Sequence, residues 1–133
     1  IASRLLGYEG GMSEVLDEAL ITYSNESKVK YLGVSPETLK RYGAVSEETC
    51  EEMARGLFEK TGADVCLVTT GIAGPTGGSE TKPVGLIYIG ISVRGKVAVY
   101  KRYFTGGREK IRVRATITAL DYLRREIRAM EEA

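Results

Sequence analysis

The chain has 133 residues, of which 43% are hydrophobic and 28% are charged, proportions that are ordinary for a folded domain with a substantial core. The net charge of +1 argues against nucleic acid or an acidic membrane surface as a partner, and no apolar run approaches the ~20 residues of a membrane span. Without histidine, a catalytic zinc site is not expected. The two cysteines, Cys50 and Cys66, are expected to be buried and reduced. We therefore expect one domain, residues 1–133, that acts in the cytoplasm without metal or cofactor.

The first predicted elements are helices separated by loops. Residues 1–6 have helical character and stop at Gly7, after which a loop follows. The apolar run 19–23 is typical of a short buried strand. Residues 25–32 are predicted to form a helix that ends at Gly33, a residue suited to a left-handed cap.

Serine marks the start of two further helices. Ser35 precedes Pro36 and predicts a side-chain cap for a short helix that closes at Gly43. Ser46 predicts the cap of a longer helix that ends at Gly62. The buried face of this longer helix is expected to hold Cys50, Met53, Ala54, Leu57 and Phe58.

Three strands and a long helix complete the pattern. Residues 64–69 are predicted to form an apolar strand, and residues 85–93 and 96–104 to form a hairpin. A helix is expected over residues 108–130, with its arginines on a solvated face. Its core stripe is predicted to be Val113, Ile117, Leu120 and Ile127. This order of elements predicts an α/β protein, a three-layer α/β/α sandwich with a mixed sheet.

A glycine-rich loop, residues 71–83, follows the first predicted strand. Thr70 precedes it, and its leading residues are Gly71, Ile72, Ala73, Gly74, Pro75, Gly77 and Gly78. Glycine lets backbone N–H groups approach an anion closely, and several such groups in one concavity bind phosphate or a developing oxyanion. The loop is not a P-loop, because no Gly-Lys-Ser/Thr closes it. It is either a ligand-binding element at the sheet edge or a long surface connection without a ligand.

Two basic residues are candidates for chemistry. Lys28 could act as a general base if burial lowers its pKa, with Tyr23 relaying or orienting the proton. Arg108 opens the last helix, where its guanidinium could clamp a phosphate or carboxylate through two parallel hydrogen bonds. The alternative for both is a solvated surface cation. No serine lies in a Gly-x-Ser-x-Gly elbow, so serine hydrolase chemistry without histidine would need a lysine base.

Segments across nearly the whole chain resemble the CinA C-terminal domain family, whose members include deamidases of nicotinamide mononucleotide (NMN). The most specific match is the run from Thr70 through Gly78, followed by Lys82-Pro83-Val84-Gly85. Further matches in register are residues 23–28, 32–34, 43–46, 52–54 and 104–108. The resemblance implies an α/β/α sandwich that hydrolyses NMN to nicotinate mononucleotide and ammonia by a Ser/Lys-type mechanism.

The resemblance also implies roles for the candidate residues. Lys28 would be the base that activates the serine, assisted by Tyr23. Thr70 and the glycine-rich loop would hold the substrate or the oxyanion, and Arg108 would contact the charged end of the substrate. The implied partner is the small nucleotide NMN, and the implied assembly is a homo-oligomer, with a dimer as the first expectation.

The nucleophile is expected outside the printed residues. In the family it belongs to a Ser-Cys-Thr-Gly-Gly segment that stands just before the part matched by residues 1–5, and Ser3 is not its equivalent. Residues 7–18 match only loosely, and Gly107 stands where an acid is common. Two other hypotheses stay open: a non-catalytic nucleotide-binding, competence-associated module, and a structural domain of a larger two-domain protein.

Overall fold

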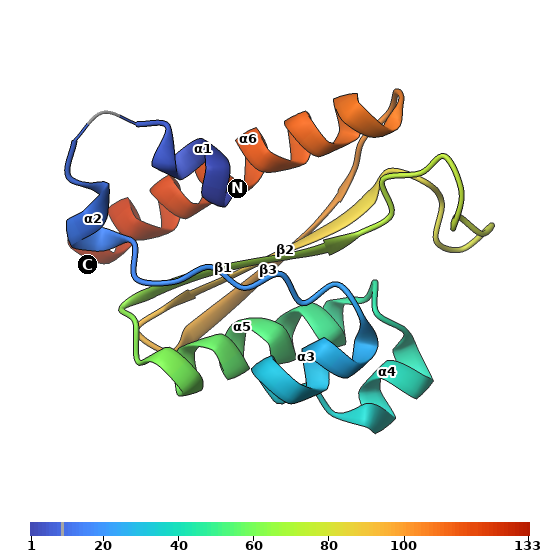
Figure 1. Ribbon diagram of the computed structural model, residues 1–133, viewed down its shortest axis with the longest axis horizontal. Coiled ribbons are helices and arrows are strands. Elements are labelled where there is room, and N and C mark those ends of the chain that lie inside the picture. The colour runs from blue at the N-terminus through green and yellow to red at the C-terminus, as the bar shows by residue number, and fades with distance from the viewer. Residues whose placement is uncertain (9) are drawn as a thin grey trace.

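The computed structural model describes residues 1–8 and 10–133 and places helices on both faces of a sheet (Figure 1). The helices α1 (Ala2–Leu6), α2 (Met12–Val15) and α6 (Arg108–Glu131) lie on one side. On the other side lie α3 (Asn25–Leu32), α4 (Pro36–Tyr42) and α5 (Glu47–Thr61). The strands are β1 (Val65–Gly71), β2 (Leu86–Val93) and β3 (Lys96–Tyr103). The predicted three-layer α/β/α architecture is confirmed.

The sheet has the order β1-β2-β3, and both neighbouring pairs are antiparallel. The sequence predicted a mixed sheet, and this prediction is wrong for the described part of the chain, where the sheet is purely antiparallel. A parallel pair needs a crossover connection, usually a helix, whereas a loop or tight turn returns the chain antiparallel. The glycine-rich loop makes that return between β1 and β2, and Arg94 and Gly95 make it between β2 and β3.

The stretch 19–23 does not form the predicted buried strand. It has no regular secondary structure, and Ile21 and Tyr23 are 92% and 85% exposed. Apolar composition favours a strand only where neighbouring strands pair with it and bury one face, and no described strand pairs with this stretch. The loop predicted after Gly7 contains the short helix α2, and its residue 9 lies outside the described residues.

The helix caps follow the sequence signals with one exception. At the start of α5, Ser46 accepts a hydrogen bond from the backbone N–H of Thr49, as predicted. At the start of α4, Ser35 makes no side-chain cap. Its own N–H instead donates to the Glu52 carboxylate (2.7 Å), which Thr38 also contacts. A side chain of α5 therefore stabilises the start of α4 and fixes the two helices to each other.

Two hydrophobic clusters lie on opposite faces of the sheet, because side chains alternate along each strand. The face toward α6 contains Ile87, Ile89 and Ile91. The face toward α3–α5 contains the buried residues Leu32, Val34, Leu39, Cys50, Met53, Ala54, Val68, Leu86 and Tyr88. The predicted face of α5 is thus confirmed, although Leu57 and Phe58 are only half-buried.

The helix α6 buries a different stripe from the predicted one. Val113 and Ile117 are each 52% exposed, whereas Ile111 and Ala119 are buried. Ile111, Ala115 and Ala119 recur every four residues and pack against the sheet, and the small alanines allow close approach between helix and sheet. The prediction considered only large apolar side chains at helical spacing, so it passed over the alanines and selected the wrong face of α6. Leu120 and Ile127, the other two predicted core residues, are half-buried.

Both cysteines are free and buried, as predicted. Burial, with a smaller contribution from the negative charge of Glu47, raises the pKa of the Cys50 thiol to about 12 from 9.0. Between these values the folded state retains a proton that the unfolded state loses, so stability falls as pH rises. From roughly pH 8 to pH 10.5, this thiol is expected to account for a loss of about 2 kcal/mol. Between these two pH values, the free energy of unfolding measured in urea should fall less for Cys50→Ala than for the wild type. An equal fall in both proteins would contradict the expectation.

Candidate active site

The side chain of Lys28 is buried on α3, with only 6% of the residue exposed. Ser24 caps this helix one turn earlier, and helical side chains point toward the N-terminus. The ammonium Nζ accordingly reaches back and donates to the carbonyl oxygens of Thr22 (2.7 Å) and Tyr23 (3.2 Å). No carboxylate among the described residues forms an ion pair with it.

Burial lowers the pKa of Lys28, because desolvation disfavours the charged ammonium. The neutral amine is therefore reached at a lower pH than in an ordinary lysine, which is the property that a general base requires. Among the described serines, no hydroxyl accepts a hydrogen bond from Lys28, since its bonds go to backbone carbonyls. The two serines on the same turn, Ser24 and Ser27, bond to each other instead.

The structure joins Tyr23 to Lys28 through the backbone carbonyl of Tyr23. Its phenol extends away, since the residue is 85% exposed. The predicted catalytic assistance by this phenol stays a prediction. The contribution of the backbone is a different one, because the carbonyl orients the Lys28 amine.

Thr70 lies near the end of β1 and is 8% exposed. Its hydroxyl donates to the carbonyl oxygen of Ala44 (2.7 Å), in the connection between α4 and α5. A hydroxyl has one proton to donate, so in this arrangement Thr70 can accept a hydrogen bond from a ligand but cannot donate one to an oxyanion. Its clear effect is to fix the start of the glycine-rich loop to the α4–α5 connection.

The glycine-rich loop leaves β1 with two bonds that extend the sheet: Ile72 N–H to Leu86 O (2.9 Å) and Gly85 N–H to Ile72 O (2.7 Å). Beyond this point the loop supplies donors without protein acceptors. Within the described residues, they are the N–H groups of Ala73, Gly74, Thr76, Gly77, Gly78, Glu80 and Thr81. Neighbouring free N–H groups are what an anion-binding concavity requires.

Gly74 is the residue at which the loop and α6 meet. It is buried with φ +79°, and a Cβ atom there would lie 2.5 Å from Val84 Cγ1, so a side chain would meet both backbone strain and a steric clash. Arg108 Nη1 donates to the Gly74 carbonyl (2.7 Å). A guanidinium has five N–H donors, so Arg108 holds the loop while keeping donors for a substrate anion.

The predicted site residues therefore form two groups in this chain. Arg108 is brought onto the loop, and Lys28 is brought onto the carbonyls that precede α3. No hydrogen bond among the described residues joins Lys28 to the loop or to Arg108. Sequence reasoning gave no role to Lys82, which donates through Nζ to the Tyr42 carbonyl. The signal was present in the Lys82-Pro83-Val84-Gly85 match.

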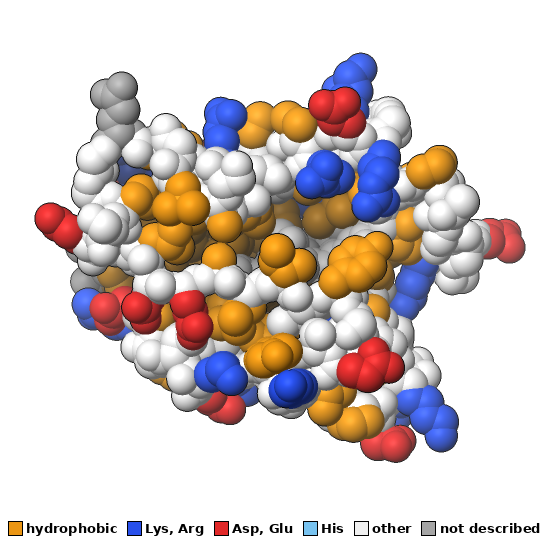
Figure 2. All heavy atoms as spheres, in the orientation of Figure 1, with side chains coloured by type: hydrophobic (Ala, Val, Ile, Leu, Met, Phe, Trp, Pro, Cys, Tyr) orange, Lys and Arg blue, Asp and Glu red, His pale blue; other side chains and the backbone are white. Residues whose placement is uncertain are grey.

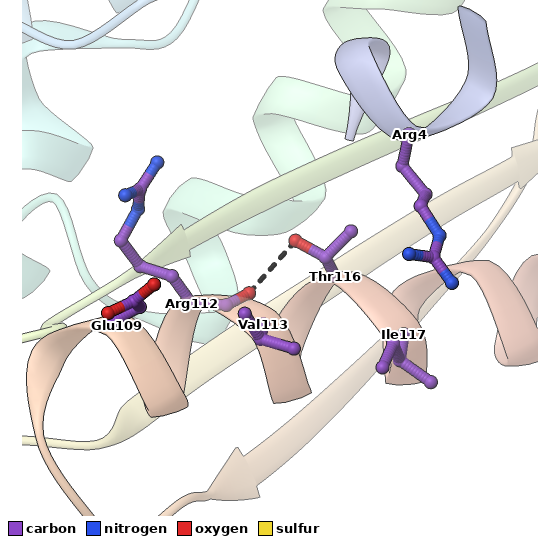
Figure 3. A pocket seen from close by; sticks show the side chains of 6 residues that line it. All are labelled: Arg4, Glu109, Arg112, Val113, Thr116 and Ile117. Carbon is purple, nitrogen blue, oxygen red and sulfur yellow. Dashed lines mark hydrogen bonds between the residues drawn. The ribbon is translucent and has the colours of Figure 1, made fainter. Parts of the chain in front are cut away.

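Two shallow hollows lie between α1 and α6, apart from these residues. One, of ≈ 260 Å³, is lined by Arg4, Glu109, Arg112, Val113, Thr116 and Ile117 (Figure 3). The other, of ≈ 450 Å³, is lined by Ile1, Ser3, Arg4, Gly7, Tyr8 and Thr116. Neither contains a predicted site residue. Figure 2 shows hydrophobic side chains reaching the surface between the two helical layers.

In the part of the chain that the structure describes, no helix is long and apolar enough to cross a membrane. The same residues contain no cluster of three or more carboxylate or cysteine side chains arranged to hold a metal ion.

These features define an α/β/α domain with a buried lysine and a loop of free N–H groups. The CinA C-terminal domain model matches residues 1–127. A Clostridium beijerinckii protein named for competence-damage induction is 56% identical over 94% of this chain and 30% of its own length. A CinA-like protein of Kosmotoga olearia is 54% identical over 96% of this chain and 31% of its own length. The chain belongs to the CinA C-terminal domain family, and it spans less than a third of the length of these relatives.

Solved structures agree with this assignment. The crystal structure of the competence damage-inducible protein A from Klebsiella pneumoniae superposes with a TM-score of 0.89 and 31% identity, covering 95% of this chain and 78% of that protein. A competence or damage-inducible protein from Enterobacter asburiae gives a TM-score of 0.86 and 33% identity, with 92% and 76% covered. The fold predicted from the family resemblance is confirmed.

Proposed function

We propose that this domain is the amide-hydrolysing part of an NMN deamidase, which converts NMN and water to nicotinate mononucleotide and ammonia. The observation that carries the proposal is the buried amine of Lys28, which has a lowered pKa and no carboxylate partner among the described residues. A structural lysine in such a place costs stability, because its charge is desolvated. A role as general base accounts for that cost.

The chemistry follows the Ser/Lys variant of acyl transfer. The nucleophilic serine of the family's Ser-Cys-Thr-Gly-Gly segment adds to the carboxamide carbon while its proton passes to the neutral Lys28 amine. The C–N bond then breaks, and ammonia leaves with the proton that Lys28 returns. Water then attacks the resulting ester and gives a proton to Lys28, and Lys28 returns that proton to the serine oxygen as the ester C–O bond breaks.

The glycine-rich loop and Arg108 support the binding half of the proposal. The free N–H groups of residues 73–78 offer hydrogen bonds to an oxyanion or phosphate. Arg108, fixed by its bond to the Gly74 carbonyl, adds a positive charge beside them. NMN presents both kinds of group: a phosphate in the ground state and a carboxamide oxygen that becomes anionic during attack.

The direct test is ammonia release from NMN by protein that includes the family's Ser-Cys-Thr-Gly-Gly segment, with nicotinamide as the comparison substrate. We expect release from NMN and at least roughly tenfold slower release from nicotinamide, because the latter lacks the phosphate that the loop would hold. NMN binding by calorimetry without ammonia release would contradict the enzyme and favour a nucleotide-binding module. If the protein neither binds NMN nor releases ammonia from it, NMN is excluded as the ligand.

A further inference from the structure

Residues 79–85, the return arm, lead from the glycine-rich loop back to β2 and are attached to α4 through Lys82. This side chain is half-buried, and its Nζ donates to the carbonyl oxygen of Tyr42 at the end of that helix. The last carbonyls of a helix have no partner inside it, and a cation is favoured at that end by the helix dipole. The bond therefore satisfies an acceptor that α4 leaves open.

A local turn fixes the position from which Lys82 reaches α4. The backbone N–H of Ser79 donates to the Lys82 carbonyl (2.8 Å), and the Lys82 N–H donates to Ser79 Oγ (3.1 Å). Gly77 and Gly78, with their free N–H groups, come directly before this turn. A displacement of the turn would therefore move the donors that precede it.

The other end of the loop is held by the α4–α5 connection, which directly follows Tyr42. Ala44, two residues after Tyr42, accepts the Thr70 hydroxyl at the end of β1 (2.7 Å). Arg108 holds the middle at Gly74 from the opposite layer. Lys82 completes this set, because its side chain attaches to α4 the part of the loop that directly follows Gly77 and Gly78.

We propose that Lys82 is a positioning residue, whose bond to the Tyr42 carbonyl keeps the N–H groups of Gly77 and Gly78 in one geometry for a phosphate group. The kinetic consequence rests on the proposed function, whereas the structural consequence does not. The competing interpretation is a surface lysine whose bond leaves the loop unaffected.

The structural experiment is residue-resolved amide exchange by NMR on Lys82→Met, Lys82→Arg and the control Lys40→Met, an exposed lysine of α4. In Lys82→Met, exchange at Ser79 and Gly85 should be about tenfold faster, because the turn that bonds Ser79 to Lys82 and the bond between Gly85 and Ile72 would lose the attachment to α4 that limits their opening. Lys82→Arg should restore the slow exchange, and Lys40→Met should not change it. The amides of the central strand β2, which pairs with β1 on one side and β3 on the other, report any global loss of stability.

The kinetic experiment uses the same variants in the NMN assay. Lys82→Met should raise KM about tenfold with kcat changed less than threefold, since a phosphate contact is present in both the ground and transition states. Unchanged exchange at Ser79 and Gly85 would overturn the proposal, as would faster exchange with an unchanged KM. If wild-type protein releases no ammonia, the proposed function fails, and the exchange data with the calorimetric affinity for NMN still decide the role of Lys82.

Discussion

Lys28→Met is expected to slow NMN hydrolysis by roughly 10²–10⁴-fold, the contribution typical of a positioned general base. Methionine fills a similar volume and carries no charge, so it removes the desolvated ammonium without opening a large cavity. The fold should therefore survive, which urea unfolding will show. The measurement is steady-state ammonia release from NMN at saturating substrate.

Two further variants make this experiment specific. Lys30→Met changes an exposed lysine of the same helix and should leave the rate within about twofold of wild type. Lys28→Arg retains a cation but cannot be deprotonated at accessible pH, so it should be about as inactive as Lys28→Met. Activity retained in Lys28→Arg would contradict the role as a base.

The pH dependence gives an independent check of the same residue. The base must be neutral, so kcat should rise with pH through the pKa of Lys28, which burial places below 10.5. Stability should rise over the same window, because the unfolded state binds more protons there. Lys28→Met should lose this stability increment, whereas Cys50 acts in the opposite direction.

Gly56→Ala is expected to destabilise the fold by about 3 kcal/mol or more, because a Cβ atom there would lie 1.6 Å from the carbonyl oxygen of Leu32. Gly56 lies inside α5, and helix propensity alone predicts that alanine stabilises such a position by about 1 kcal/mol. The two arguments thus predict changes of opposite sign in the free energy of unfolding. The steric contact has the larger effect, since the clashing atoms belong to the backbone of α3 and cannot move away by changing a rotamer.

The matched control is Gly107→Ala, where a Cβ atom would meet nothing within 4 Å and φ is −70°. We expect its free energy of unfolding to change by less than about 1 kcal/mol. Urea midpoints of the two variants measure the difference. A Gly56→Ala protein at least as stable as wild type would mean that α3 and α5 do not approach each other as described.

Local signals predicted most of the elements. Ser46 and Gly62 bound α5, and Gly33 ends α3, because capping depends on residues a few positions away. The signals failed where a remote residue decides. Glu52 replaces the expected cap of Ser35, and the stretch 19–23 lacks the strand partner that its composition favours.

The candidate site divides in the same way. Lys28, Arg108 and the glycine-rich loop were named from residue type and family resemblance, and their chemical roles stay predictions. The structure decided what each side chain contacts: Lys28 bonds to carbonyls, Thr70 to Ala44, and Arg108 to Gly74. The last of these contacts joins residues 34 positions apart, which no local pattern encodes.

By itself the sequence determined the family, the layered α/β architecture and the position of the glycine-rich loop, because these follow from periodicity, caps and a specific motif. Only the tertiary structure decided that Lys28 is buried, that α6 presents its alanine stripe to the sheet, and that Lys82 attaches the loop to α4. The physical reason is that burial and hydrogen-bond partners depend on which distant segments meet. A side chain's pKa and donors are set by those neighbours rather than by its place in the chain.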